Sequence, residues 1–179
     1  MKVCIYGAGA IGGFIGASLA SLPGQAVSAV ARGETLAALR AQGWRLRRNG
    51  ELQVAPCAAV SDDPAELGVQ DLVVVAVKAT SLPAVATRIA PLLGPDTLVL
   101  PAMNGVPWWF CAGVPGFEGH ALDSVDPGGG IAAALPAAQV IGCVVHISCS
   151  TPEPGLVQHK MGHGLIVGEP RGGRSERAQ

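Results

Sequence analysis

The feature that most constrains this chain is a glycine-rich turn near its start, placed between a predicted strand and a predicted helix. Residues 2–6 are a short apolar run, and residues 7–12 come next with the spacing Gly-x-Gly-x-x-Gly. Apolar residues then recur at helical spacing over residues 11–22, a Pro-Gly pair ends the helix, and residues 26–31 form a second apolar run. The segment is a βαβ unit of about thirty residues, which predicts an α/β fold of the Rossmann type with parallel strands.

Each glycine of the turn has its own expected role in binding a dinucleotide. Gly7 would make the tight turn, Gly9 would let the backbone approach a pyrophosphate, and Gly12 would let the helix pack closely on the sheet. The helix start adds free N–H groups and the positive end of the helix dipole. The alternative is a glycine-rich turn that binds no ligand. The predicted cofactor-binding loop comprises Gly7, Ala8, Gly9, Ala10, Ile11 and Gly12.

The end of the second strand predicts which dinucleotide binds. NAD-dependent enzymes usually place an acidic residue there to accept a hydrogen bond from the ribose 2′-hydroxyl. This chain has Arg32 instead, and a guanidinium can pair with a 2′-phosphate. The sequence therefore favours NADP (NADPH). Two alternatives stay open: Arg32 is a solvated surface residue, or Glu34 faces the ribose.

Two further buried strands each deliver a polar residue to the edge of the sheet where such folds bind ligands. Residues 71–77 and 97–102 are nearly continuous apolar runs, as expected for central parallel strands. Lys78 comes directly after the first and could reach the phosphates on the adenosine side. Asn104 comes after the second and could orient a nicotinamide or a substrate hydroxyl with its amide. The alternatives are a solvated lysine and an ordinary Asn-Gly turn.

The remaining elements complete a doubly wound α/β domain with a mainly parallel sheet and antiparallel edge strands. Residues 112–135 are rich in Gly, Pro and Ala with weak periodicity, and predict a long connection. Helices are predicted over residues 34–42 and 81–93, and a hairpin over residues 44–48 and 51–55 around an Asn-Gly turn. Antiparallel edge strands are expected at residues 140–148, 155–159 and 165–168.

Length and composition allow one sizeable hydrophobic core. The chain has 179 residues, of which 49% are hydrophobic, and this size leaves little room for a second core. We expect a single domain over residues 1–170. Residues 171–179 are polar and glycine-rich, and are expected to form a flexible tail or the start of a linker.

Charge and hydropathy argue against two classes of partner. A net charge of −1 with 14% charged residues creates no overall field to attract nucleic acid or an anionic membrane. Glycines interrupt the apolar N-terminus before a signal sequence or a membrane span is complete. Five cysteines without a Cys-x-x-Cys pair fit reduced thiols better than a disulfide framework. We therefore expect a soluble, cytoplasmic protein.

The histidines and cysteines do not predict a metal site. Cys143, His146 and Cys149 have a spacing that suggests zinc, but on a strand the two cysteines share one face while the histidine points to the other. His159 and His163 are four residues apart, but Gly162 and the predicted strand-turn context argue against a shared helical face. We therefore expect no bound metal.

Four short motifs, GAGAIGG, ARG, VKAT and MNGV, each come after a predicted strand, and together they resemble the ketopantoate reductase family. Residues 154–168 are also similar to edge strands of that family. Its members reduce 2-dehydropantoate to (R)-pantoate with NADPH, a step of pantothenate synthesis. The resemblance assigns the pyrophosphate to the three glycines of the turn, the 2′-phosphate to Arg32 and Lys78, and the nicotinamide or the 2-oxo acid substrate to Asn104.

The chain departs from this family beyond its nucleotide-binding half. Family enzymes continue into a helical C-terminal domain that supplies the lysine proton donor and a substrate-binding carboxylate, whereas this sequence stops at Gln179. No catalytic residue is assigned here, and the chain is expected to pair with such a domain, with self-association also possible. An exposed apolar docking face is expected around Trp108, Trp109 and Phe110. The alternatives are a non-catalytic NADP-binding module and a dehydrogenase for another 2-oxo or hydroxy acid or a polyol phosphate.

Overall fold

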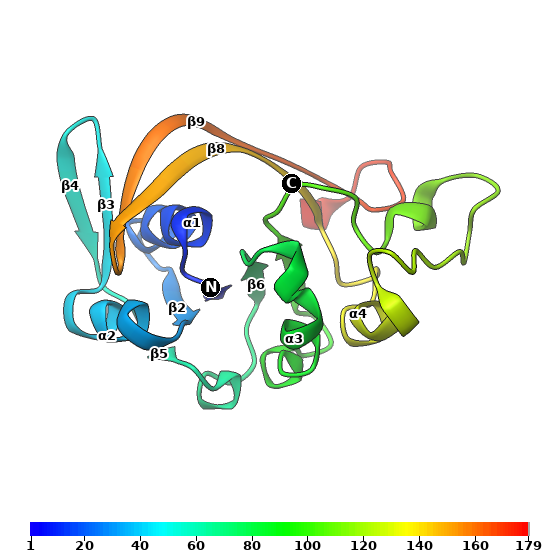
Figure 1. Ribbon diagram of the computed structural model, residues 1–179, viewed down its shortest axis with the longest axis horizontal. Helices are drawn as coiled ribbons and strands as arrows, with labels where there is room; N and C mark the ends of the chain where they lie inside the picture. Colours follow the sequence, from blue (N-terminus) through cyan, green and yellow to red (C-terminus); the bar gives the residue numbers. More distant parts are fainter. Residues whose placement is uncertain (179) are drawn as a thin grey trace.

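The centre of the fold is a five-stranded parallel sheet in the order β5-β2-β1-β6-β7. The computed structural model describes residues 1–178 (Figure 1). The order runs outward from β1 in both directions, which is the doubly wound arrangement. The expected Rossmann-type α/β fold is confirmed. The strands are β1 (Lys2–Tyr6), β2 (Ala26–Val30), β5 (Val60–Ser61), β6 (Leu72–Val75) and β7 (Leu98–Pro101).

An apolar cluster covers each face of this sheet, and the side chains of β1 contribute to both clusters. Val3 and Ile5 belong to the apolar cluster that includes α1, whereas Cys4 and Tyr6 belong to the cluster on the side of α3 and α4. Alternate residues of a strand point to opposite faces, so a strand buried on both sides must be apolar throughout. The helices are α1 (Ala10–Ala20), α2 (Gly33–Gln42), α3 (Leu82–Ala86) and α4 (Gly130–Ala134).

Short 3₁₀ turns replace helix in several connections. The single helix expected over residues 81–93 is instead α3, flanked by η2 and η3. Pro91 explains the break, because proline has no N–H to continue the helix and disfavours helical geometry in the preceding residue. The 3₁₀ turns are η1 (Pro64–Glu66), η2 (Ala79–Ser81), η3 (Ala90–Leu92), η4 (Phe110–Gly113), η5 (Pro127–Gly129) and η6 (Glu176–Ala178).

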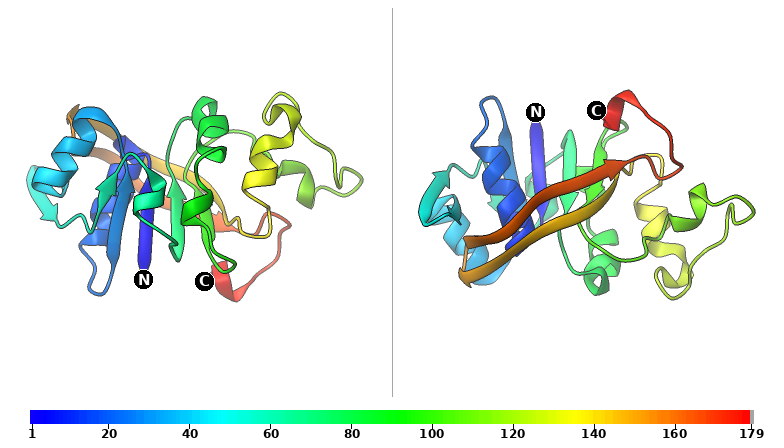
Figure 2. Two further views of the ribbon diagram at one scale, coloured as in Figure 1. Left: turned by 90° about the horizontal axis from the view of Figure 1, so that it is seen from below. Right: turned by 90° about the horizontal axis from the view of Figure 1, so that it is seen from above.

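The antiparallel strands form a second sheet rather than the edge of the first. Its order is β4-β3-β9-β8, and it lies across α1 (Figures 1 and 2). The hairpin predicted around Asn49-Gly50 is confirmed, with both turn residues at positive φ. β9 pairs parallel with β3 and antiparallel with β8. The strands are β3 (Trp44–Arg48), β4 (Glu51–Ala55), β8 (Gly142–Glu153) and β9 (Leu156–Gly168).

A β-bulge hides the continuity of β9 from the sequence. The two short strands expected at residues 155–159 and 165–168 are one strand, and its pairing with β8 shifts register between His146 and Ser148. At the bulge Gly162 has φ +75, and a Cβ there would lie 2.1 Å from the His146 carbonyl oxygen. Only glycine fits, so the apolar pattern is interrupted inside the strand.

The glycine-rich connection contains a helix that the sequence did not predict. The Asp126 carboxylate accepts hydrogen bonds from the backbone N–H groups of Ile131 and Ala132, both at 2.8 Å, and so anchors the start of α4. Trp108 is buried and donates from its indole to the Leu135 carbonyl at 3.1 Å. The prediction of an exposed apolar face around Trp108, Trp109 and Phe110 is therefore wrong for Trp108, although Phe110 is 51% exposed.

The described part of the tail folds back onto the domain. Arg177 donates to both carboxylate oxygens of Glu169 and to the Ala138 carbonyl. Ala178 packs against the main apolar cluster. Gln179 lies outside the described residues, and the division between a domain over residues 1–170 and a tail or linker stays a prediction.

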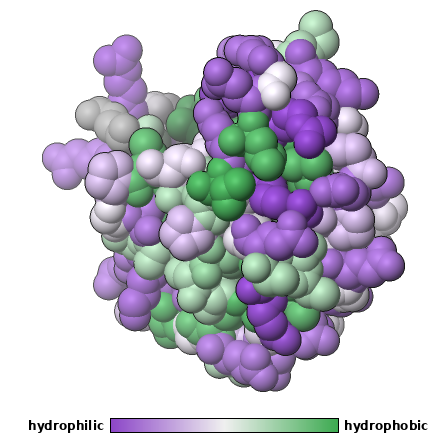
Figure 3. Space-filling model, turned by 90° about the vertical axis from the view of Figure 1, so that its left-hand side faces the viewer, coloured by the Kyte–Doolittle hydropathy of each residue, from purple (hydrophilic) through white to green (hydrophobic). Residues whose placement is uncertain are grey.

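The surface on the side of the β3–β4 hairpin is mixed. Leu52 and Val54 of β4 are each more than half exposed. Figure 3 shows this side of the molecule, with apolar side chains gathered in its middle among hydrophilic ones. Within residues 1–178, no helix has the length and apolar character needed to cross a membrane.

Small residues let α1 lie close to the second sheet. A Cβ on Gly13 would lie 2.5 Å from the Val157 side chain of β9, and one on Gly16 would lie 2.5 Å from two ring atoms of Trp44 in β3. Trp44 is 1% exposed, so its ring has no room to retreat. The helix fits between the sheets only because these positions carry no side chain.

We predict that Gly16→Ala lowers the free energy of unfolding by about 1–3 kcal/mol, because overpacking against a rigid buried ring outweighs the better helix propensity of alanine. Urea unfolding monitored by circular dichroism measures the change. Gly130→Ala is the matched control, since Gly130 has φ −66 and no atom within 4 Å of an added Cβ. An unchanged midpoint for Gly16→Ala would contradict the packing described here.

Candidate functional site

The glycine turn joins the carboxyl end of β1 to the start of α1. Gly7 has φ +96 and donates its N–H to the Val30 carbonyl at 3.0 Å, which ties the turn to β2. A Cβ on Gly12 would lie 2.0 Å from the Gly7 carbonyl oxygen, so helix and turn touch through backbone. A Cβ on Gly9 would meet nothing within 4 Å. Gly7 and Gly12 therefore have the conformational roles expected of them, and Gly9 faces open space.

The open space beside Gly9 is part of a cavity of about 540 Å³, here called the glycine-turn cavity. It lies at the carboxyl ends of β1, β2 and β6, where doubly wound sheets bind ligands. Arg32 lines it, whereas Glu34 does not. Its lining residues are Tyr6, Gly7, Ala8, Gly9, Val30, Ala31, Arg32, Thr35, Asp62, Val77, Thr80, Ser81, Ala84, Val85 and Arg88.

The second cation on this cavity is not the one the sequence singled out. Lys78 is exposed at the carboxyl end of β6 and does not line the cavity, although its neighbour Val77 does. Arg88, which lies just after α3, lines it instead. No sequence signal marked Arg88, because an arginine near the end of a short helix is usually a solvated surface residue.

Tyr6 lines the cavity together with Arg32 and Arg88. Burial raises the pKa of its phenol, and the positive charges of Arg88 and then Arg32 partly oppose this rise. Both charges are thus close enough to act on the same hydroxyl. The inner wall of the cavity is consequently rich in hydrogen-bond donors and in positive charge.

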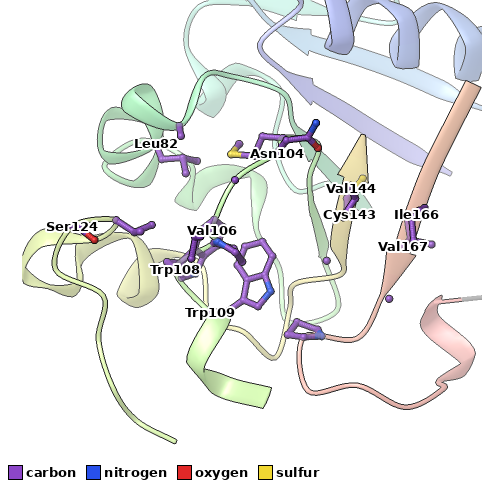
Figure 4. A pocket seen from close by; sticks show the side chains of 18 of the residues that line it. Leu82, Asn104, Val106, Trp108, Trp109, Ser124, Cys143, Val144, Ile166 and Val167 are labelled. Carbon is purple, nitrogen blue, oxygen red and sulfur yellow. The ribbon is translucent and has the colours of Figure 1, made fainter. Parts of the chain in front are cut away.

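A second cavity, of about 700 Å³, adjoins the first and is here called the Asn104 cavity (Figure 4). Thr80 lines both, so the two spaces meet at the turn after β6. Asn104 lies on one wall, Leu82 comes from α3, and Trp108 and Trp109 lie in the loop after β7. The opposite wall is formed by Cys143, Val144, Ile166 and Val167 of the β8–β9 hairpin.

Asn104 has a structural role that sequence reasoning missed. Its Oδ1 accepts from the Val145 N–H at 2.8 Å, and its Nδ2 donates to the Val145 carbonyl at 3.0 Å. The side-chain amide therefore pairs with β8 as a strand backbone would. Nothing local could reveal this, because the partner lies 41 residues further along the chain. A contact of Asn104 with nicotinamide or substrate stays a prediction, supported by its place on the cavity wall.

The carboxyl and thiol groups of the Asn104 cavity are poor proton donors at neutral pH. Hydrogen bonds from Arg177 and Ser175 lower the pKa of Glu169 to about 2, which keeps it ionised. Burial raises the pKa of the Cys143 thiol to about 11. Among the described residues that line this cavity, Glu169 is the only carboxylic acid.

The histidines and cysteines of the second sheet are not gathered into a metal centre. The rings of His159 and His163 are stacked with centroids 4.9 Å apart, and His159 also packs 5.2 Å from the Phe14 ring. His159 Nε2 lies 2.7 Å from the Gly162 carbonyl oxygen. Over residues 1–178, no group of three or more His, Cys, Asp or Glu side chains is placed to hold a metal ion.

The parallel sheet, the glycine turn and the adjoining cavities define a Rossmann-type α/β domain. The sequence profile described as ketopantoate reductase PanE/ApbA matches residues 3–108, which is more than half of the chain. The chain therefore belongs to the ketopantoate reductase family, as its four motifs indicate.

Similar proteins extend well beyond this domain. A 2-dehydropantoate 2-reductase from Mesorhizobium japonicum is 48% identical over 178 residues, which cover 99% of this chain and 54% of that protein. A crystal structure from Ralstonia solanacearum MolK2, described as a candidate ketopantoate reductase, has a TM-score of 0.92 and 51% identity over 98% of this chain and 54% of its own. A 2-dehydropantoate 2-reductase structure from Porphyromonas gingivalis W83 has a TM-score of 0.70 and 29% identity, covering 89% of this chain and 51% of its own. The chain spans about half the length of these relatives.

We predict that Asn104→Asp loosens the junction between the loop after β7 and β8, because a carboxylate cannot donate to the Val145 carbonyl and repels it. Leaving a buried acceptor without its partner costs about 1–3 kcal/mol. Hydrogen exchange at the amides around Val145 should become faster, while exchange in β1 changes little. Equal protection in variant and parent would contradict the bridging role of Asn104.

Proposed function

We propose that this chain is the cofactor-binding half of an NADPH-dependent 2-oxo acid reductase, with 2-dehydropantoate to (R)-pantoate as the expected reaction. The observation that carries the proposal is the open face of Gly9. It borders a cavity that Arg32 also lines, and this cavity shares the lining residue Thr80 with the Asn104 cavity. A dinucleotide is an elongated molecule with phosphates in its middle, and two adjoining cavities would accommodate its two ends. The named relatives act on this 2-oxo acid.

The residues present fit NADPH. The free N–H groups at the start of α1 would hold the pyrophosphate, since Gly9 leaves room for its approach. Arg32 would pair with the 2′-phosphate and select NADPH over NADH. The family resemblance also assigns Lys78 to binding the 2′-phosphate, although Lys78 does not line the glycine-turn cavity.

The Asn104 cavity would receive the nicotinamide end and the substrate. When bound, the cofactor supplies a hydride from C4 of the nicotinamide. Asn104 retains one N–H and one carbonyl lone pair beyond its bonds to Val145, which suffice to orient an amide or a hydroxyl. Leu82 and Trp109 exclude water from the apolar part of the cavity.

Among the described residues that line the Asn104 cavity, neither the carboxyl group nor the thiol is a convincing source of the proton that completes the reduction. Glu169 is held ionised by Arg177 and Ser175, and the thiol of Cys143 has a pKa of about 11. An alkoxide formed in the cavity needs a nearby acid. We therefore propose that the donor belongs to a further domain, as the greater length of the relatives suggests.

We also propose that the reaction takes place in the cytoplasm. The five free cysteines support this location, because thiols stay reduced there.

We predict that Gly9→Val abolishes NADPH binding and leaves the fold intact, because the added side chain enters the open space proposed for the pyrophosphate. Fluorescence titration measures binding, and far-ultraviolet circular dichroism with thermal melting measures folding. A folded Gly9→Val protein that binds NADPH with the parent affinity would remove the glycine turn from the site.

We also predict that the protein binds NADPH about tenfold to a hundredfold more tightly than NADH, and that Arg32→Ala removes most of this preference. A charge-assisted hydrogen bond contributes roughly 1.5–3 kcal/mol. Isothermal titration with both nucleotides gives the ratio. Glu34→Ala is the control, since Glu34 lies two residues away and does not line the cavity. Retention of the full preference in Arg32→Ala would refute the assignment.

A further inference from the structure

Arg88 is held in a defined position on the wall of the glycine-turn cavity. Its Nη2 donates to the Asp62 carbonyl at 3.0 Å and lies 3.9 Å from Oδ1 of Asp63. These two contacts involve one nitrogen of a planar group that carries five N–H donors. The contacts fix the guanidinium, and the remaining donors are available to a ligand.

Arg88 and Arg32 line the same cavity, Arg32 from just after β2 and Arg88 from beyond α3. The positive charges of both lower the pKa of the Tyr6 phenol, which lines this cavity too, and the effect of Arg88 is the larger. Thr35 and Ser81 add hydroxyl groups to the same lining.

The charged side chains that line this cavity favour an anion. Two guanidiniums line the cavity, and the one carboxylate among its lining residues is Asp62. Asp63 offsets part of the Arg88 charge at 3.9 Å, but does not line the cavity. A phosphate carries a charge near −2 at neutral pH and takes several donors at once, so two arginines suit it better than one.

We infer that the 2′-phosphate of NADPH binds between Arg32 and Arg88, so that Arg88 is a second residue that selects NADPH over NADH. Arg88 thereby has the role that the sequence pattern gave to Lys78, whose side chain does not line this cavity. The inference rests on the proposed function, because it requires a dinucleotide at the glycine turn.

The expected effect is selective and moderate. The Arg88 side chain is 48% exposed, so solvent weakens its interaction with a phosphate. Arg88→Ala should lower the affinity for NADPH about tenfold, at the lower end of the range for a charge-assisted contact, and leave the affinity for NADH within about twofold. Arg88→Lys keeps a charge but loses the planar fork, and should restore part of the NADPH affinity.

The experiment is a calorimetric titration of the full-length protein and its variants with NADPH and with NADH. Arg40→Ala is the matched control, because Arg40 is also exposed and its Nη2 also donates to a backbone carbonyl, that of Val60 at 3.2 Å, but outside the cavity. Lys78→Ala tests the rival cation. Urea midpoints of all variants show whether each has kept the fold.

Selective loss of NADPH affinity in Arg88→Ala, with Arg40→Ala near the parent, supports the inference. Equal loss for both nucleotides, or selective loss in Lys78→Ala but not in Arg88→Ala, overturns it. Failure of the parent protein to bind either nucleotide would instead refute the proposed function. The two failures are therefore distinguishable.

Discussion

The backbone contact between Gly12 and the Gly7 carbonyl is the constraint on which the rest of this structure depends. A Cβ at Gly12 would lie 2.0 Å from that oxygen, so any side chain would push α1 away from the turn. The contact aims the N-terminus of α1 at the open space beside Gly9. It also fixes the height of α1 over the sheet, and Gly13 and Gly16 then allow β9 and β3 to close over the other side of the helix. The open N-terminus of α1 and the stacking of the second sheet share one cause.

The second sheet contributes to the site through a single polar bridge. Asn104 joins the loop after β7 to β8 by two hydrogen bonds to Val145, and the β8–β9 hairpin thereby becomes a wall of the Asn104 cavity. In the right-hand view of Figure 2 the orange hairpin runs from beside β3 towards β7. The Asn104 amide thus uses one N–H and one carbonyl lone pair to hold β8, and its second N–H and second lone pair are not used by these bonds.

The sequence predicts what is local and periodic, and misses what depends on distant partners. The parallel strands and the Asn49-Gly50 hairpin are predicted by apolar runs and by turn chemistry, and both are confirmed. The course of β9 is missed because the Gly162 bulge interrupts its pattern. Of the expected cofactor residues, Arg32, Gly7 and Gly9 line one cavity, whereas Gly12 and Lys78 do not. Arg88 lines the cavity and contacts Asp62 and Asp63, which lie far from it in the sequence, so no local pattern could indicate its position.

The most direct test is a crystal structure of the full-length protein with NADPH bound. We expect the pyrophosphate to lie against the N–H groups just after Gly9, with the nicotinamide in the Asn104 cavity and the adenosine in the glycine-turn cavity. A dinucleotide bound in the reverse direction, or bound away from the glycine turn, would contradict the central claim that this turn and its two adjoining cavities form the cofactor site.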